Sequence, residues 1–262
     1  MLQNIDLTGQ TALIMGASQG IGLATAKVLV NYGATVVLAA RSFDKVKAHA
    51  SAISTSDANA LAVTCDVSDY NSVQRATEFT IEKTDRLDIL INNAGVIEPL
   101  ERLIESDPDI WGKAADINYK GVYHCMRAAL PHMQQQNNGT IINMSSGAAN
   151  SALVGWSHYC STKAAVKKLT EVAHKEFIEK NIHIIGLSPG TVATPMMQKI
   201  RDANINPVSH LDWNTHIPPE WVGEGVVFLC SDQGKVFAGT DFSLKTAEGR
   251  KLVGLPSDNT PN

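Results

Sequence analysis

A tyrosine and a lysine stand four residues apart in the second half of the chain, a spacing that places both on one face of a helix. They are Tyr159 and Lys163, and apolar residues continue the helical periodicity after them at Val166, Leu169 and Val172. At this spacing the two Cβ atoms lie roughly 5–6 Å apart. A free phenol has a pKa of about 10, and a neighbouring ammonium lowers that pKa by stabilising the phenolate. The pair therefore predicts a group that gives and takes a proton during catalysis.

Two other polar side chains lie near this pair in sequence. Ser146 precedes Tyr159 by thirteen residues and ends a predicted strand, so its hydroxyl is a candidate to hydrogen-bond an oxygen on which negative charge develops. Ser145 is a neighbour of the same type, and the spacing favours Ser146. His158 would point about a quarter-turn away from Tyr159 on a helix, which makes it a candidate substrate contact and not the main base. Taken singly, such residues more often pack in a core or lie on a surface.

A glycine-rich turn follows the first apolar run, Thr11 to Met15, and opens a helical pattern. Glycines here allow a tight turn and a close approach of backbone to a pyrophosphate, while the helix start presents N–H groups and a positive dipole end. The order strand, turn, helix favours dinucleotide binding over a purely structural turn. The candidate phosphate contacts are Gly16, Ser18, Gln19, Gly20, Ile21 and Gly22.

The second apolar run, Thr35 to Ala39, leads into Arg41 and Ser42, about 20 residues beyond the glycine turn. An acidic side chain at this point would accept hydrogen bonds from a ribose 2′-hydroxyl and select NAD. A guanidinium suits a 2′-phosphate instead. The nearest carboxylate, Asp44, is expected to open the next helix. We therefore predict that NADP(H) is favoured and that NAD(H) is possible; the alternative is a solvated arginine in a surface turn.

The elements that must position these residues alternate between apolar runs and helical patterns, which is typical of βαβ units. Runs with few polar positions suit strands that helices cover on both faces. We predict an α/β single-domain Rossmann fold over residues 1–262, with a doubly wound parallel sheet of about seven strands. Six strands are expected at Thr11–Met15, Thr35–Ala39, Leu61–Val63, Leu87–Ile91, Thr140–Met144 and Ile182–Leu187. Residues 196–219 form a candidate substrate lid, and residues 256–262 are expected to fray.

Composition limits the possible partners. The formal net charge of −4 argues against nucleic acid or an anionic membrane as the main partner, since both require a basic surface. No apolar run approaches the roughly 18 residues of a membrane span, and the first ten residues lack the pattern of a signal peptide. The four cysteines form no CxxC pair and no cluster has metal-ligand spacing, so we expect reduced thiols, a cytoplasmic location and no metal.

From Leu7 to about Gly239 the chain resembles the short-chain dehydrogenase/reductase family. The matching motifs occur in order: Gly16 to Gly22, Asp66, Asn92-Asn93-Ala94-Gly95, Asn118, Ser146, Tyr159-Cys-Ser-Thr-Lys163 and Pro189-Gly190. The ordered set is far more specific than any one motif. The resemblance implies a nicotinamide-dependent oxidoreductase that interconverts a carbonyl compound and an alcohol.

The resemblance also implies roles for individual residues. Asp66, with Val67, is expected to hold the adenine amino group, and Asn118 to hold a water that links Lys163 to solvent. Lys163 is further expected to hydrogen-bond the nicotinamide ribose, next to Tyr159. The turn beside the adenosine ribose is Asn93, Ala94 and Gly95, and the segment near the carboxamide comprises Pro189, Gly190, Val192 and Thr194.

Family members of this size are mostly homotetramers or homodimers built on two long helices, here expected over residues 109–134 and 157–180. One departure concerns Gly239 to Arg250, where the family commonly has an Asp-Gly-Gly segment; this puts the C-terminal wall of the pocket in doubt. An extended-branch epimerase or dehydratase is a related alternative. A catalytically inactive dinucleotide sensor or interaction module is the alternative from a different class, and it would require the loss of Tyr159 or Lys163.

Overall fold

The computed structural model describes residues 5–55 and 58–257. Within these residues, seven parallel strands form one sheet in the order β3-β2-β1-β4-β5-β6-β7. The strands are β1 Thr11–Met15, β2 Thr35–Ala40, β3 Ala60–Thr64, β4 Ile89–Asn92, β5 Gly139–Met144, β6 Ile182–Ser188 and β7 Asp241–Ser243. The central strands are apolar and buried along their whole length because helices cover both faces of the sheet. The predicted Rossmann fold is confirmed.

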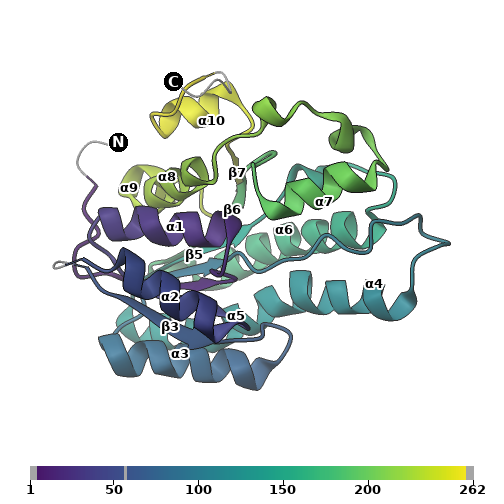
Figure 1. Ribbon diagram of the computed structural model, residues 1–262. Helices are drawn as coiled ribbons and strands as arrows, with labels where there is room; N and C mark the ends of the chain where they lie inside the picture. The colour runs from purple at the N-terminus through teal and green to yellow at the C-terminus, as the bar shows by residue number, and fades with distance from the viewer. Residues whose placement is uncertain (1–4, 56–57, 258–262) are drawn as a thin grey trace.

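Two layers of helices enclose the sheet (Figure 1). The helices are α1 Gly20–Asn31, α2 Phe43–Ile53, α3 Tyr70–Thr84, α4 Pro108–Ala115, α5 Gly121–Gln136, α6 Ser157–Phe177, α7 Pro195–Ala203, α8 Pro219–Cys230, α9 Asp232–Lys235 and α10 Ala247–Leu252. Short helical turns are η1 Asp116–Lys120, η2 Gly147–Asn150, η3 Ile178–Lys180, η4 Pro207–His210 and η5 Trp213–Thr215.

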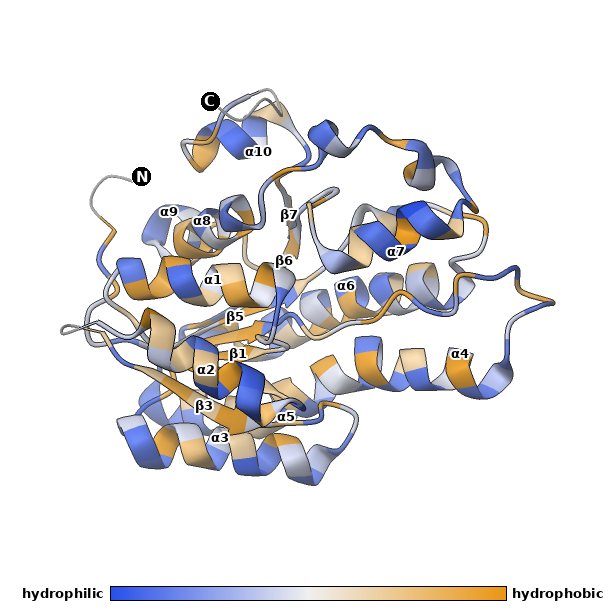
Figure 2. Cartoon of the chain, viewed as in Figure 1, coloured by the Kyte–Doolittle hydropathy of each residue, from blue (hydrophilic) through white to orange (hydrophobic). Residues whose placement is uncertain are grey.

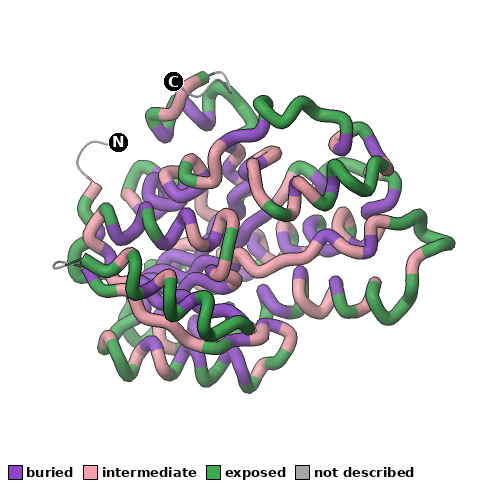
Figure 3. Tube along the Cα trace, in the orientation of Figure 1, coloured by how far each residue is buried: buried purple, intermediate pink, exposed green. Residues whose placement is uncertain are grey.

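The apolar core has two parts, one on each face of the sheet. Helices α1, α2 and α8 pack on one face through side chains such as Leu29, Val46 and Val226. Helices α3, α5 and α6 pack on the other through side chains such as Val73 and Val166. Figure 2 shows the strands as hydrophobic bands between helices whose residues alternate in hydropathy, and Figure 3 shows the central strands as buried.

Strand order reverses at the centre of the sheet, where β1 pairs with β2 on one side and with β4 on the other. In an open α/β sheet, ligands bind in the crevice beyond the carboxyl ends of the strands at this point. The end of β1 at Met15 aligns with the end of β4 at Asn92. The glycine turn after β1 and the Asn93-Ala94-Gly95 turn after β4 therefore meet at one edge.

The differences from the predicted elements are small and local. The fourth strand begins at Ile89 and not at Leu87, whose backbone N–H and carbonyl oxygen are hydrogen-bonded to the Gln136 side chain, at 3.0 and 2.9 Å, and not to a strand. The seventh strand is only three residues long and lies within the atypical C-terminal segment. In residues 196–219, predicted as a lid, α7 is followed by η4 and η5. Of the predicted frayed tail, residues 258–262 lie outside the described residues.

Candidate active site

The glycine turn and the turn after β4 are packed directly against each other. Gly16 has φ +79°, and a Cβ on it would lie 2.7 Å from the Ala94 Cα. A Cβ on Gly22 would lie 2.5 Å from the Gly16 carbonyl oxygen, so only glycine lets α1 approach the turn this closely. The Asn93 side-chain amide donates to the carbonyl oxygens of Met15 at 3.2 Å and Gly16 at 3.0 Å. These contacts explain why the two motifs occur together.

A cleft of about 330 Å³ opens above this contact and contains the start of α1. Among the described residues, Gln19 caps α1 without a side-chain hydrogen bond, which leaves the first N–H groups of the helix to the cleft. Of the predicted cofactor contacts, those that line the cleft are Gly16, Ser18, Gln19, Gly20, Ile21, Arg41, Ser42, Asp66, Val67, Asn93, Ala94, Gly95 and Thr194. The glycine cradle and the free helix start fit a dinucleotide pyrophosphate.

At the far end of the cleft, the ends of β2 and β3 place Arg41 and Ser42 opposite Asp66. Burial raises the pKa of Asp66, but hydrogen bonds from the Ser68 hydroxyl and backbone N–H, together with the Arg41 charge, hold that pKa below its ordinary value. Asp66 therefore stays an acceptor at neutral pH. Arg41 and Ser42 are exposed, so their donors are accessible to a ligand in the cleft.

The β6 end closes the cleft from the opposite side. Pro189 and Gly190 follow β6 directly, and Val192 is buried where it bridges to Ile217. Thr194 caps the N-terminus of α7, and a Cβ on Gly20 would lie 3.5 Å from its methyl carbon. Thr194 thus faces the glycine turn across the cleft. Six of the predicted cofactor contacts do not line the cleft itself. They are Pro189, Gly190 and Val192, and also Gly22, Tyr159 and Lys163.

Three of the predicted catalytic residues lie together at the junction of β5 and α6. The Lys163 ammonium lies 5.6 Å from the centre of the Tyr159 ring and donates to the Met144 carbonyl oxygen at 2.6 Å. Burial raises the pKa of Tyr159 to about 12, although a hydrogen bond with the Ser146 side chain acts in the opposite direction. Burial also lowers the pKa of Lys163 to about 8. The pKa of Tyr159 is thus raised and not lowered as expected from Lys163, because burial of the phenol is the largest cause of its shift.

Asn118 lies in η1, a π-helical turn between α4 and α5. π-helical turns inside longer helices are frequent at functional sites. The side chain is fully buried, accepts from the Val96 N–H at 2.8 Å and donates to the Val96 carbonyl at 2.8 Å. Asn118 is thereby fixed against the loop that follows β4 and the Asn93-Ala94-Gly95 turn.

His158, next to Tyr159 in sequence, is buried and does not line the cleft. It is 1% exposed, and its Nε2 atom lies 2.8 Å from the Ile97 carbonyl oxygen. Burial lowers its pKa. His158 therefore joins α6 to the loop after β4, and its predicted role as a substrate contact stays a prediction.

Two polar pairs could not be predicted from the sequence because their partners are distant in the chain. The Ser145 hydroxyl donates to the Asp241 carboxylate at 2.9 Å, across 96 residues. Glu98 and Lys199 form an ion pair between the loop after β4 and α7, and both line the cleft. The local sequence around each residue carries no signal of its partner.

Comparison with known proteins agrees with this geometry. A sequence model of the short chain dehydrogenase family matches residues 10–205. The 3-oxoacyl-(acyl-carrier-protein) reductase FabG of Thermotoga maritima is 30% identical over 236 residues, 89% of this chain and 95% of that protein. Oxidoreductase UcpA of Salmonella typhimurium is 37% identical over 244 residues, 89% of this chain and 92% of that protein.

Among solved structures, the 3-ketoacyl-(acyl-carrier-protein) reductase of Brucella melitensis complexed with NADH aligns with a TM-score of 0.81 and 28% identity, covering 91% of this chain and 98% of that one. The chain belongs to the short-chain dehydrogenase/reductase family. It is an oxidoreductase of a family that binds NAD(H) or NADP(H).

Proposed function

We propose that this enzyme interconverts a ketone or aldehyde and an alcohol, with Tyr159 as the proton donor and acceptor and NADP(H) as the preferred cofactor. The observation that carries the proposal is the contact of Tyr159 with both Ser146 and Lys163 beside the dinucleotide cleft. NAD(H) remains possible as a cofactor, since a related reductase is complexed with NADH.

The proton chemistry follows from the side chains. A bound nicotinamide supplies or accepts the hydride, which is chemistry that the protein itself cannot provide. The Ser146 hydroxyl donates a hydrogen bond to the substrate oxygen and stabilises developing alkoxide charge. Tyr159 gives its proton to that oxygen in reduction and takes it back in oxidation. The Lys163 ammonium stabilises the phenolate that results.

Cofactor binding uses four groups of residues along the cleft. The uncapped start of α1, at Gln19, binds the pyrophosphate. Asp66 accepts a hydrogen bond from the adenine amino group, and Arg41 with Ser42 binds a ribose 2′-phosphate. Thr194, at the opposite wall, contacts the carboxamide end.

The substrate of this site is a small, uncharged carbonyl compound or alcohol. Tyr159 packs against an apolar cluster that includes Ile97, Trp156 and Met197, and the Trp156 and Tyr159 ring centres are 5.5 Å apart. Partly buried members of the same cluster, Leu153, Cys160 and Met196, offer apolar surface that favours apolar groups of a substrate.

A panel of ketones, aldehydes and secondary alcohols, followed by nicotinamide absorbance with NADPH, NADH and their oxidised forms, tests the proposal. We expect turnover with apolar ketones and a higher kcat/KM with NADPH. Cofactor binding without turnover of any panel member would favour the alternative, a catalytically inactive dinucleotide-binding module.

A further inference from the structure

A carboxylate from the last strand reaches the same stretch of backbone as Lys163, because Lys163 donates to the Met144 carbonyl oxygen and Asp241 binds the side chain of the next residue, Ser145. Asp241 begins β7, next to the carboxyl end of β6. Its Oδ2 atom accepts from the Ser145 hydroxyl at 2.9 Å. Its Oδ1 atom is buried and has no hydrogen-bond partner among the described residues. An orphaned buried carboxylate oxygen is costly unless a positive charge lies close by.

The chain makes room for this carboxylate. A Cβ on Gly186 of β6 would lie 2.7 Å from the Asp241 Oδ1 atom, so a larger residue there would displace it. The Gly186 N–H donates to the Thr240 carbonyl oxygen at 2.9 Å, which fixes the backbone just before Asp241. The carboxylate is therefore held in position from β5, through Ser145, and from β6.

The charges that face Asp241 come from one side of α6. Burial raises the pKa of Asp241, whereas the charges of Lys167 and Lys163, one helical turn apart, lower it, and Glu171, a further turn along, raises it. Lys167 also donates to the Asn150 side-chain oxygen at 2.7 Å, and Glu171 pairs with Lys168, so both have partners elsewhere. Lys163 donates to a neutral carbonyl oxygen, that of Met144, and burial lowers its pKa while the charge of Asp241 acts in the opposite direction.

We propose that Asp241 is a positioning residue of the active site: it supplies the counter-charge of the Lys163 ammonium and, through Ser145, fixes the turn that carries Ser146. The catalytic part of this inference rests on the proposed function. The charge coupling does not, because it concerns two groups of the folded protein itself.

A double-mutant cycle tests the charge coupling without cofactor or substrate. Asp241→Asn keeps the size of the side chain and an acceptor for Ser145 while removing the charge. In urea unfolding at pH 7, we expect Asp241→Asn to lower the folding equilibrium constant about tenfold more when Lys163 is present than in a Lys163→Met background. Equal effects in the two backgrounds would show that Asp241 is not the counter-charge of Lys163. If Asp241→Asn alone does not fold, the double variant should; failure of both would also overturn it.

The pH dependence of kcat/KM tests the catalytic consequence, with cyclohexanone and NADPH as probes. Without the counter-charge, the Lys163 ammonium loses its proton at lower pH, so the alkaline limb should move down by about one pH unit in Asp241→Asn. Glu171→Gln removes a neighbouring, partly exposed carboxylate and should leave the limb in place. Ser145→Ala keeps both charges, so it should lower kcat without moving the limb. An unmoved limb in Asp241→Asn, or a wild-type kcat in Ser145→Ala, contradicts the corresponding half of the proposal. If the wild type turns over no probe while the cycle shows coupling, only the proposed function fails.

Discussion

Tyr159 and Lys163 illustrate how burial and charge act together at the scale of single residues. Burial disfavours the charged form of each, so the pKa of the phenol rises to about 12 and that of the lysine falls to about 8. Burial thus opposes charge on both groups, although a pKa of about 8 still leaves Lys163 protonated at pH 7. In the proposed reaction the phenolate and the ammonium stabilise each other at the moment when the proton moves.

Removing the Tyr159 hydroxyl should stop proton transfer and leave the fold intact. Tyr159→Phe keeps the ring that packs against Trp156. We expect kcat to fall roughly 10²–10⁴-fold, the usual contribution of general acid–base catalysis, with little change in the Kd of NADPH measured by fluorescence. Near-normal turnover of this variant would show that Tyr159 is not the proton donor.

Lys163→Met should inactivate the enzyme and at the same time stabilise it. The pKa of Lys163 is lowered from 10.5 to about 8. Below pH 8 the lysine is therefore charged in the folded and in the unfolded protein, and burying its charge costs about 3 kcal/mol of folding free energy. The penalty diminishes as pH rises from 8 to 10.5. The lost hydrogen bond to Met144 offsets about 1 kcal/mol. We expect Tm to rise by about 5 °C at pH 7 and by less at pH 10.5.

Thermal unfolding followed by circular dichroism checks whether the Tm of Lys163→Met rises as expected. Lys175→Met, at an exposed position of the same helix, is the matched control and should leave Tm unchanged at both pH values. A Lys163→Met variant that is less stable than the wild type at pH 7 would mean that burial of the ammonium is compensated in the folded state.

Arg41 should decide the choice of cofactor, because it is the guanidinium at the adenosine end of the cleft. Arg41→Asp replaces a phosphate donor with a group that repels phosphate and can accept from a ribose hydroxyl. We expect kcat/KM for NADPH to fall about 10- to 100-fold, with a far smaller change for NADH. Lys47→Asp is the control, because Lys47 is exposed, like Arg41, but lies on α2, outside the cleft. A wild-type enzyme with higher kcat/KM for NADH would contradict this assignment.

At the scale of elements, the strands were predictable wherever burial on both faces demanded an apolar run. The glycine turn could also be predicted, since Gly16 and Gly22 satisfy geometric needs that are local in sequence. β7 could not, because a three-residue strand with polar residues at both ends has no distinctive pattern. The Asp241–Ser145 and Glu98–Lys199 pairs depend on where the topology brings distant segments together, and no local propensity encodes that.

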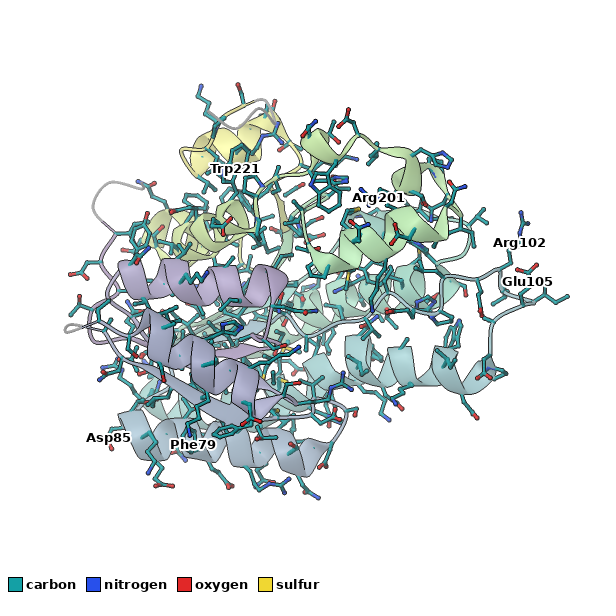
Figure 4. All side chains as sticks on the ribbon, viewed as in Figure 1. Phe79, Asp85, Arg102, Glu105, Arg201 and Trp221 are labelled. Atoms are coloured by element: carbon teal, nitrogen blue, oxygen red, sulfur yellow. The ribbon has the colours of Figure 1, made fainter. Side chains whose placement is uncertain are left out.

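We propose that residues 196–219 act as the substrate lid. A Cβ on Gly155 would lie 2.5 Å from the Ile205 Cδ1 atom, and Asn206 donates to the Val154 carbonyl oxygen at 3.1 Å, so the segment rests on the turn before α6. Arg201, labelled on α7 in Figure 4, lies 5.4 Å from the Trp213 ring centre and joins the two ends of the segment. The Glu98–Lys199 pair holds α7 over the cleft.

Breaking that pair should loosen the lid without unfolding the protein. Both side chains are about half exposed, so Lys199→Ala should cost less than about 1 kcal/mol of stability. We expect a KM for cyclohexanone raised about threefold to fivefold, consistent with such a modest interaction energy, and faster proteolysis within residues 196–219. Lys235→Ala, on α9 in an exposed ion pair with Asp232, is the control. Unchanged KM and unchanged proteolysis would show that the pair does not hold the lid.

At the scale of the whole molecule, no helix among the described residues is long and apolar enough to cross a membrane. The four cysteines, all within the described residues, are free thiols. Apolar side chains nevertheless remain at the surface of the long helices that the sequence analysis singled out. Those helices are continuous in the structure, as α4, η1 and α5 over residues 108–136 and as α6 with η3 over residues 157–180.

We expect these helices to pair with their copies in a homodimer or homotetramer. α4 and α6 pack against each other within the chain, and they leave Ile110 of α4, Tyr123 of α5 and Val172 of α6 between 45% and 50% exposed. Burying large apolar side chains stabilises association by roughly 1.5–3 kcal/mol for each residue that becomes fully buried. A glutamate at such a position would instead be desolvated in the interface.

Sedimentation velocity at micromolar protein should therefore show a multiple of the chain mass of 28.2 kDa. Ile110→Glu combined with Tyr123→Glu should shift the protein toward monomer, while Val236→Glu, at an exposed apolar residue after α9, should leave the assembly unchanged. This result does not depend on catalysis, since the proposed catalytic residues all come from one chain. A wild-type protein that sediments as a monomer would mean that the exposed side chains of these helices serve no contact between copies.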